Sequence, residues 1–196
     1  MKRKIRFYRL AVVAALAAVM VMLCAGCKAK TPSYLVVEGT TVTGYTENIP
    51  ANLVIPKGIT KIAEDAFREC KSFESVVIST SVKEIGSGAF YECGSFRVEY
   101  EGTLVQWCEM DNDSSLGRNA KSIKLKDRPD LKAVTTLDLT GAKRIGAYAF
   151  SGCKSLESVV IPVSVKEIVN STFYECMSLA SVEYIRNARA VVRDGQ

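Results

Sequence analysis

Apolar residues recur in this chain at spacings that change within each short segment. Between Phe73 and Ile78, the apolar residues Phe73, Val76 and Ile78 are separated by polar or outward positions, a pattern that predicts a strand burying alternate residues. The next segment, from Ile85 to Phe90, is too short for an independent helix and is rich in glycine and serine. It predicts a tight turn, or a single turn of 3₁₀- or α-helix, that returns the chain beneath the strand.

The same pattern returns every 23 residues. The segments 54–76, 77–99, 137–159 and 160–182 align with one another. A single unit of this kind cannot bury its own apolar face, whereas stacked units share a continuous core. The repeat therefore predicts a solenoid. The repeated positions predicted to form its stacked core are Phe67, Cys70, Phe90, Cys93, Phe150, Cys153, Phe173 and Cys176.

The repeat unit resembles the BspA-type leucine-rich repeats of bacterial surface proteins, as in "VIPVSVKEI" followed by "TFYECMSLASV" within 160–182. The resemblance covers about 34–184, and "YEGTLVQW" at 100–107 resembles a segment that interrupts such arrays. Ser79 and Leu139 replace the proline of the family pattern. The resemblance implies a leucine-rich-repeat solenoid of the β-dominated α/β class. Each coil of about 23 residues would supply one parallel strand, with short helical or 3₁₀ turns on the opposite side.

Departures from the 23-residue frame divide the predicted repeat domain, 34–196, into five parts. We expect a hairpin cap at 34–45, repeats at 54–99, an irregular insert at 100–136, repeats at 137–184 and a C-terminal tail at 185–196. In and beside the insert we expect strands at 98–100 and 122–125, a polar turn at 111–119 and a hairpin tip at 126–130. The tail is compatible with an amphipathic cover, a partner-binding edge or a truncated array, because repeat arrays need polar ends.

The first 26 residues have the layout of an export signal. Five Lys or Arg and no acidic residue occupy 1–10, and an uncharged apolar run follows from Leu10 to Gly26. The stretch "LCAGC" at 23–27 resembles a bacterial lipobox. That resemblance implies a lipoprotein signal peptide at 1–26, a lipid on Cys27 and a tether at 27–33. Cleavage without lipid and a retained membrane helix stay open.

Charge and composition exclude several classes of function. Five of the 26 basic residues lie in the signal segment, which leaves 21 basic against 21 acidic residues, so the remaining chain has no basic excess for nucleic acid. The chain contains no histidine, which excludes Ser-His-Asp and Cys-His catalysis and the common zinc sites. A Ser-Lys pair stays open, but no serine or lysine stands out. We therefore expect no enzymatic activity, no metal and no cofactor.

The repeated cysteines are predicted to be packing residues. A catalytic cysteine occurs once per site and needs a base, and a row of thiols on stacked coils does not enclose a metal ion. Disulfides between Cys70 and Cys93, or Cys153 and Cys176, are compatible with strands spaced about 4.8 Å apart. The parallel direction of stacked side chains argues against such bonds, as does the odd number of cysteines after Cys27.

A solenoid offers a broad, regular surface that suits a protein ligand better than a small-molecule substrate, which needs a concave pocket. The outward strand positions predicted to bind are Val54, Val77, Glu99, Asp138, Val160 and Glu183; the alternative is that they are ordinary solvated sheet residues. The resemblance implies adhesion to host matrix proteins or to other bacteria. We expect a membrane-anchored lipoprotein of the outer membrane or cell surface, an orientation that Lys28 favours. The alternative is an assembly protein that self-associates through an uncapped C-terminal coil.

Overall fold

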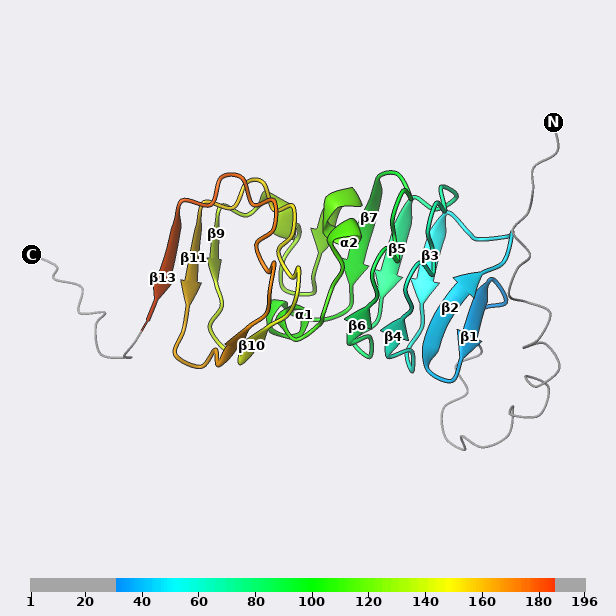
Figure 1. Cartoon of the computed structure of the whole chain (residues 1–196), viewed down its shortest axis with the longest axis horizontal. Coiled ribbons are helices and arrows are strands. Elements are labelled where there is room, and N and C mark those ends of the chain that lie inside the picture. Colours follow the sequence, from blue (N-terminus) through cyan, green and yellow to red (C-terminus); the bar gives the residue numbers. More distant parts are fainter. Residues whose placement is uncertain (1–30, 186–196) are drawn as a thin grey trace, which may run out of the picture. The chain divides into compact units, whose positions relative to one another are not determined.

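The computed structural model describes residues 31–185, which wind into stacked coils (Figure 1). One strand of each coil lies on the same side, and we call these the front strands. They form a four-stranded sheet in the order β3-β5-β7-β8 and a three-stranded sheet in the order β9-β11-β13, and all their pairings are parallel. The front strands are β3 (Asn52–Ile55), β5 (Ser75–Ile78), β7 (Phe96–Tyr100), β8 (Ala120–Lys124), β9 (Thr136–Asp138), β11 (Ser158–Ile161) and β13 (Ser181–Tyr184). The leucine-rich-repeat solenoid expected from the sequence is confirmed.

The side of the coil that follows β3, β5, β9 and β11 carries a second set of short parallel strands, the return strands. The sequence predicted only turns in this region, because a two-residue strand leaves no alternation to detect. The first return strands continue an antiparallel hairpin of β1 (Leu35–Glu38) and β2 (Thr41–Tyr45) in the order β1-β2-β4-β6. The return strands are β4 (Lys61–Ile62), β6 (Glu84–Ile85), β10 (Arg144–Ile145) and β12 (Glu167–Ile168).

The turns after the return strands contain pairs of residues with left-handed backbone. These pairs are Asp65 and Glu69, Gly88 and Glu92, Tyr148 and Gly152, and Ser171 and Glu175. For a residue other than glycine this conformation costs roughly 1–2 kcal/mol. Hydrogen bonds between neighbouring coils stabilise it, since the Phe67 N–H donates to the Ala89 carbonyl at 2.9 Å and the Phe150 N–H to the Thr172 carbonyl at 2.9 Å. The stacking of coils thus stabilises a turn that is locally unfavourable.

The insert between the two sets of repeats is more structured than the sequence indicated. Helix α1 (Leu104–Cys108) begins with a capping box made by Thr103 and Gln106. Helix α2 (Ser114–Asn119) occupies much of the segment predicted to be a polar turn, and Asp113 caps it by accepting the Ser115 N–H. That prediction was wrong because the polar residues that suggest a turn are also those that favour a helix N-terminus.

The link from β8 to β9 differs from the predicted hairpin. The Leu125 N–H donates to the Arg128 carbonyl at 2.9 Å, which closes a tight turn, but β9 pairs with β11 and not with β8. Beside β8, the Asp130 carboxylate accepts the Ile123 N–H at 3.0 Å, and a 3₁₀ helix, η1 (Leu131–Ala133), follows. The front strands are therefore divided into two sheets at this point.

The core is a column of side chains between the front and return strands. Phe67 and Phe90 stack with ring centroids 5.4 Å apart, and Phe150 and Phe173 do the same at 5.4 Å. Phe67, Phe90 and Phe150 are fully buried, whereas Phe173 in the last described coil is only partly buried. Each coil therefore depends on its neighbours on both sides for its burial.

Candidate functional site: an outward strand face

The six side chains predicted to bind a ligand all point outward from the front strands, in two groups. In the first sheet Val54, Val77 and Glu99 occupy one row across the strands, and the row continues to Lys124 of β8, which the sequence analysis had not included. In the second sheet the row contains Asp138, Val160 and Glu183. We call these two rows the strand face. Within it Val54 is 38% exposed.

Strand alternation explains this arrangement. Leu53 and Ile55 on either side of Val54 are buried, because successive side chains of a strand point to opposite faces. A second outward row carries mostly small polar residues, and Ser75 donates from its hydroxyl to the Asn52 side-chain carbonyl at 2.7 Å. The result is an exposed sheet surface on which Arg97, Glu99, Lys124 and Glu183 are the long charged side chains.

Four of the seven residues of the strand face are charged, and all four are exposed. Lys124 Nζ lies 2.9 Å from Glu99 Oε1, and more than half of each side chain is exposed, so the pair contributes at most about 1 kcal/mol to stability. Asp138 accepts the Thr140 hydroxyl at 2.6 Å and the Thr140 N–H at 2.8 Å. These hydrogen bonds lower the pKa of Asp138, which keeps a fixed negative charge on the second sheet.

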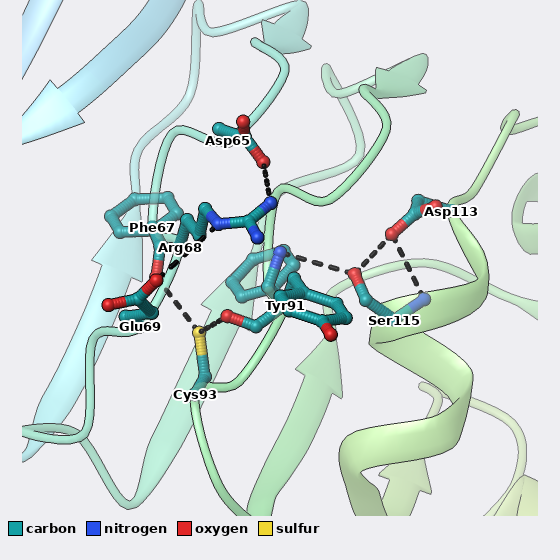
Figure 2. A network of polar contacts seen from close by, with 9 residues as sticks. Asp65, Phe67, Arg68, Glu69, Tyr91, Cys93, Asp113 and Ser115 are labelled. Carbon is teal, nitrogen blue, oxygen red and sulfur yellow. Dashed lines mark hydrogen bonds and ion pairs between the residues drawn. The ribbon is translucent and has the colours of Figure 1, made fainter.

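A second exposed surface, which the sequence analysis did not predict, lies on the turns. Figure 2 shows Arg68 between the Asp65 carboxylate and the ring of Tyr91; its guanidinium carbon is 4.5 Å from the ring centroid. Arg118 of helix α2 makes the same kind of contact with Tyr174 in the last turn, with its guanidinium carbon 5.8 Å from the ring centroid. Tyr and Arg are, with Trp, the residues enriched at the energetic centres of protein interfaces. The repeat could have revealed this surface, because the position directly after the core phenylalanine holds Arg68, Tyr91 and Tyr174 in three of the four units.

The cysteines lie in the core as single thiols. Within residues 31–185, Cys70, Cys93, Cys108, Cys153 and Cys176 are all free, and the first four are buried. The Cys93 thiol donates to the Phe67 carbonyl at 2.9 Å (Figure 2), and the Cys176 thiol donates to the Phe150 carbonyl at 3.0 Å. These two thiols thus bind a carbonyl of the preceding coil.

The hydroxyl of Ser115 also has a structural role. Ser115 donates to the Asp113 carboxylate, and its hydroxyl accepts the Phe90 N–H at 3.2 Å (Figure 2). This contact joins helix α2 to the preceding coil. No cluster of three or more His, Cys, Asp or Glu that could hold a metal ion occurs in the part of the chain that the structure describes.

We expect the buried thiols to resist modification in the folded protein. Burial raises the pKa of Cys93, Cys108 and Cys153 to about 12, and the thiolate is the reactive form. After brief treatment of the full chain with N-ethylmaleimide, peptide mapping should show Cys70, Cys93, Cys108 and Cys153 unmodified without urea and modified in urea. Cys176, which is only partly buried, should react first among the five. Equally rapid labelling of all five in native protein would contradict this prediction.

The same thiols predict a loss of stability at alkaline pH. An unfolded cysteine titrates near pH ~8.5, whereas burial raises the pKa of Cys108 to about 12 in the folded chain. The unfolded state therefore releases protons first, so this contribution to stability is complete below about pH 8.5 and is lost as pH rises toward 12. The urea midpoint should fall between pH 8 and pH 10, and the fall should be smaller for Cys108→Ala. An equal fall in both proteins would exclude this cause.

Several predicted features lie outside the described residues. They include the signal peptide at 1–26, the lipidation site Cys27 and the start of the tether. Among residues 31–185, no helix has the length and apolar character needed to cross a bilayer.

A parallel solenoid with a coil of about 23 residues and a core of stacked apolar side chains defines the class of leucine-rich-repeat proteins. The chain matches the family described as "BspA type Leucine rich repeat region" over residues 45–107 and 130–191, with six copies of the repeat. The match covers more than half of the chain, and the chain belongs to this family.

The chain is similar to solved structures of proteins from several bacteria. A leucine rich cell surface protein from Faecalibacterium prausnitzii A2-165 is 26% identical, with a TM-score of 0.39, over 76% of this chain and 36% of that protein. The T. pallidum leucine rich repeat protein is 26% identical, with a TM-score of 0.36, over 72% of this chain and 62% of that protein. The chain thus spans only part of either protein. No curated protein is significantly similar to it.

Proposed function

We propose that this protein is an exported, lipid-anchored protein of the bacterial cell surface that binds other proteins through its strand face. In this proposal the bound proteins belong to the host matrix or to the surfaces of other cells. The observation that carries the proposal is the pair of outward rows on the front strands, in which Val54, Val77 and Val160 present apolar surface among charged side chains. Such a surface is suited to many weak contacts over a large area.

The shape of this surface favours a protein ligand over a small molecule. A small-molecule site buries most of its ligand in a cleft of at least ~300 Å³, whereas the recess on the strand face at Glu99, Tyr100 and Lys124 measures about 270 Å³ and is partly open to solvent. The Tyr and Arg side chains on the turns provide a second region with the composition of an interface. Membership of a bacterial surface-protein family supports the same conclusion.

Binding assays on the full chain test the role of the strand face. The probes are immobilised fibronectin, fibrinogen and collagen, together with intact cells of other bacteria. We expect saturable binding to at least one probe, and a Kd raised at least ~10-fold by Val54→Glu, which corresponds to about 1.4 kcal/mol. Val36→Glu is the matched control, since Val36 is 44% exposed on the hairpin, and it should change the Kd less than about twofold.

Two outcomes would overturn the proposal. If no probe binds saturably, the protein is not an adhesin for these surfaces; if both variants weaken binding equally, the strand face is not the contact. Location and anchoring are tested separately. Protease treatment of intact cells should remove the protein, and radioactive palmitate should label the natural chain but not Cys27→Ala.

A further inference from the structure

The last described coil leaves uncovered the apolar positions that earlier coils bury. Ile168 is 40% exposed, whereas its counterpart Ile145 is 0% exposed. Tyr184 is 60% exposed, whereas Ile161 one coil earlier is 3% exposed. These side chains line an open groove of about 380 Å³. The lining residues that matter here are Ile161, Val163, Val165, Ile168, Tyr184 and Ile185.

The residues that follow this coil continue the repeat. In every unit a seven-residue leg joins the front strand to the return strand: 56–62 "PKGITKI", 79–85 "STSVKEI", 139–145 "LTGAKRI" and 162–168 "PVSVKEI". The segment 185–191 "IRNARAV" fits the same frame. Its fourth position holds Ala188 where the others hold Ile59, Val82, Ala142 and Val165, and its last position holds Val191 where the others hold isoleucine. The family match also extends to residue 191.

Ile185 already has the register that this leg requires. Its N–H donates to the Ile161 carbonyl at 3.0 Å. In the earlier legs two further donors bind the preceding coil: the Lys166 N–H donates to the Lys143 carbonyl at 2.8 Å, and the Val169 N–H to the Ile145 carbonyl at 2.9 Å. One coil later, the corresponding donors are the N–H groups of Arg189 and Val192.

We propose that residues 186–192 occupy this groove as the return leg of one more half-coil, with Ala188 over Val165 and Val191 over Ile168. Arg189 and Val192 then donate to the carbonyls of Lys166 and Ile168, and the segment adds a parallel strand beside β12. Attachment at Ile185 gives this segment a high effective concentration at the groove, which favours it over a separate molecule. The alternative occupant of the groove is a second copy of the chain, which is expected if the last coil is an assembly surface.

Hydrogen exchange on the full chain tests the proposal with a matched pair of variants. Val191→Asp places a carboxylate at the buried position of the leg, whereas Ala190→Asp places it at the position held by Glu84 and Glu167, which are exposed. In the unaltered protein the amides of Arg189 and Val192 should exchange at least ~10-fold more slowly than in an unstructured peptide of the same sequence. Val191→Asp should abolish this protection, and Ala190→Asp should retain it.

The same hydrogen-exchange measurements can also contradict the proposal. Unstructured exchange rates at both amides, or equal loss of protection in the two variants, would overturn the proposal. Light scattering distinguishes the second copy, because protection that appears only with a concentration-dependent doubling of mass would assign the groove to a dimer. Hydrogen exchange and light scattering do not measure ligand binding. A negative result for the C-terminal segment therefore does not bear on the proposed role of the strand face, which the binding assays test.

Discussion

Replacement of Phe90 by alanine should lower the free energy of unfolding by about 3–5 kcal/mol, as expected for a fully buried phenylalanine. The Phe90 ring is 0% exposed and stacks on Phe67 with a centroid separation of 5.4 Å. It also lies 5.5 Å from the Phe96 ring of the next front strand. Alanine would leave a cavity shared by neighbouring coils, and backbone that stacks on both sides cannot collapse to fill it. Urea unfolding followed by circular dichroism measures the change.

Phe173 provides the comparison, because it holds the same position in the last described coil but is only partly buried. It stacks on Phe150 at 5.4 Å on one side. Phe173→Ala should therefore cost less, about 1–2 kcal/mol. Tyr91→Ala, at an exposed neighbouring position, should change stability by less than about 1 kcal/mol. Equal losses for Phe90→Ala and Phe173→Ala would show that stacking between coils does not determine stability.

Replacement of Trp107 by alanine should have an effect of similar size, about 3–5 kcal/mol. Trp107 belongs to helix α1 of the insert and is 1% exposed. Its indole N–H donates to the Ala149 carbonyl at 2.7 Å, and its ring meets the Tyr100 ring at 5.4 Å and 71°. The side chain thus joins the first repeats, the insert and the second repeats. Its removal should also separate unfolding into two transitions, because a solenoid is held together only by contacts between neighbours.

Trp107→Phe isolates the hydrogen bond from the packing. It keeps an aromatic ring but leaves the buried Ala149 carbonyl without its donor, which costs about 1–3 kcal/mol. We expect an intermediate loss and a single transition, measured by circular dichroism because Trp107 is the only tryptophan. A Trp107→Ala protein that unfolds in one transition at the original midpoint would show that the insert does not couple the two sets of repeats.

The position of the insert between the repeats depends on ion pairs that no local pattern indicated. Arg144 donates to both carboxylate oxygens of Asp111, at 2.9 and 3.0 Å, and to Glu167 at 3.0 Å. The backbone of Asp111 also forms a parallel β-bridge with Glu84 of the preceding return strand, and its carbonyl accepts the Ile85 N–H at 2.8 Å. Glu167 lies one repeat of 23 residues after Arg144. Asp111 is 33 positions from Arg144 and 27 from Glu84, so neither the repeat nor a helical or strand period relates Asp111 to them. Together they continue the row of return strands across the insert.

The sequence by itself determined the features that follow from a short period. The 23-residue repeat fixed the stacking of Phe67 on Phe90, and strand alternation fixed the outward direction of Val54 and Val77, because both depend on neighbours at a constant separation. Only the tertiary structure decided the return strands, helix α2, the division of the front sheet before β9 and the contact of Arg118 with Tyr174. The return strands pair at the repeat separation of 23 residues, but each is only two residues long, so no alternation of apolar residues reveals it. The other features depend on groups that approach one another without a fixed separation in sequence, and the free energy that selects them arises only when the coils stack.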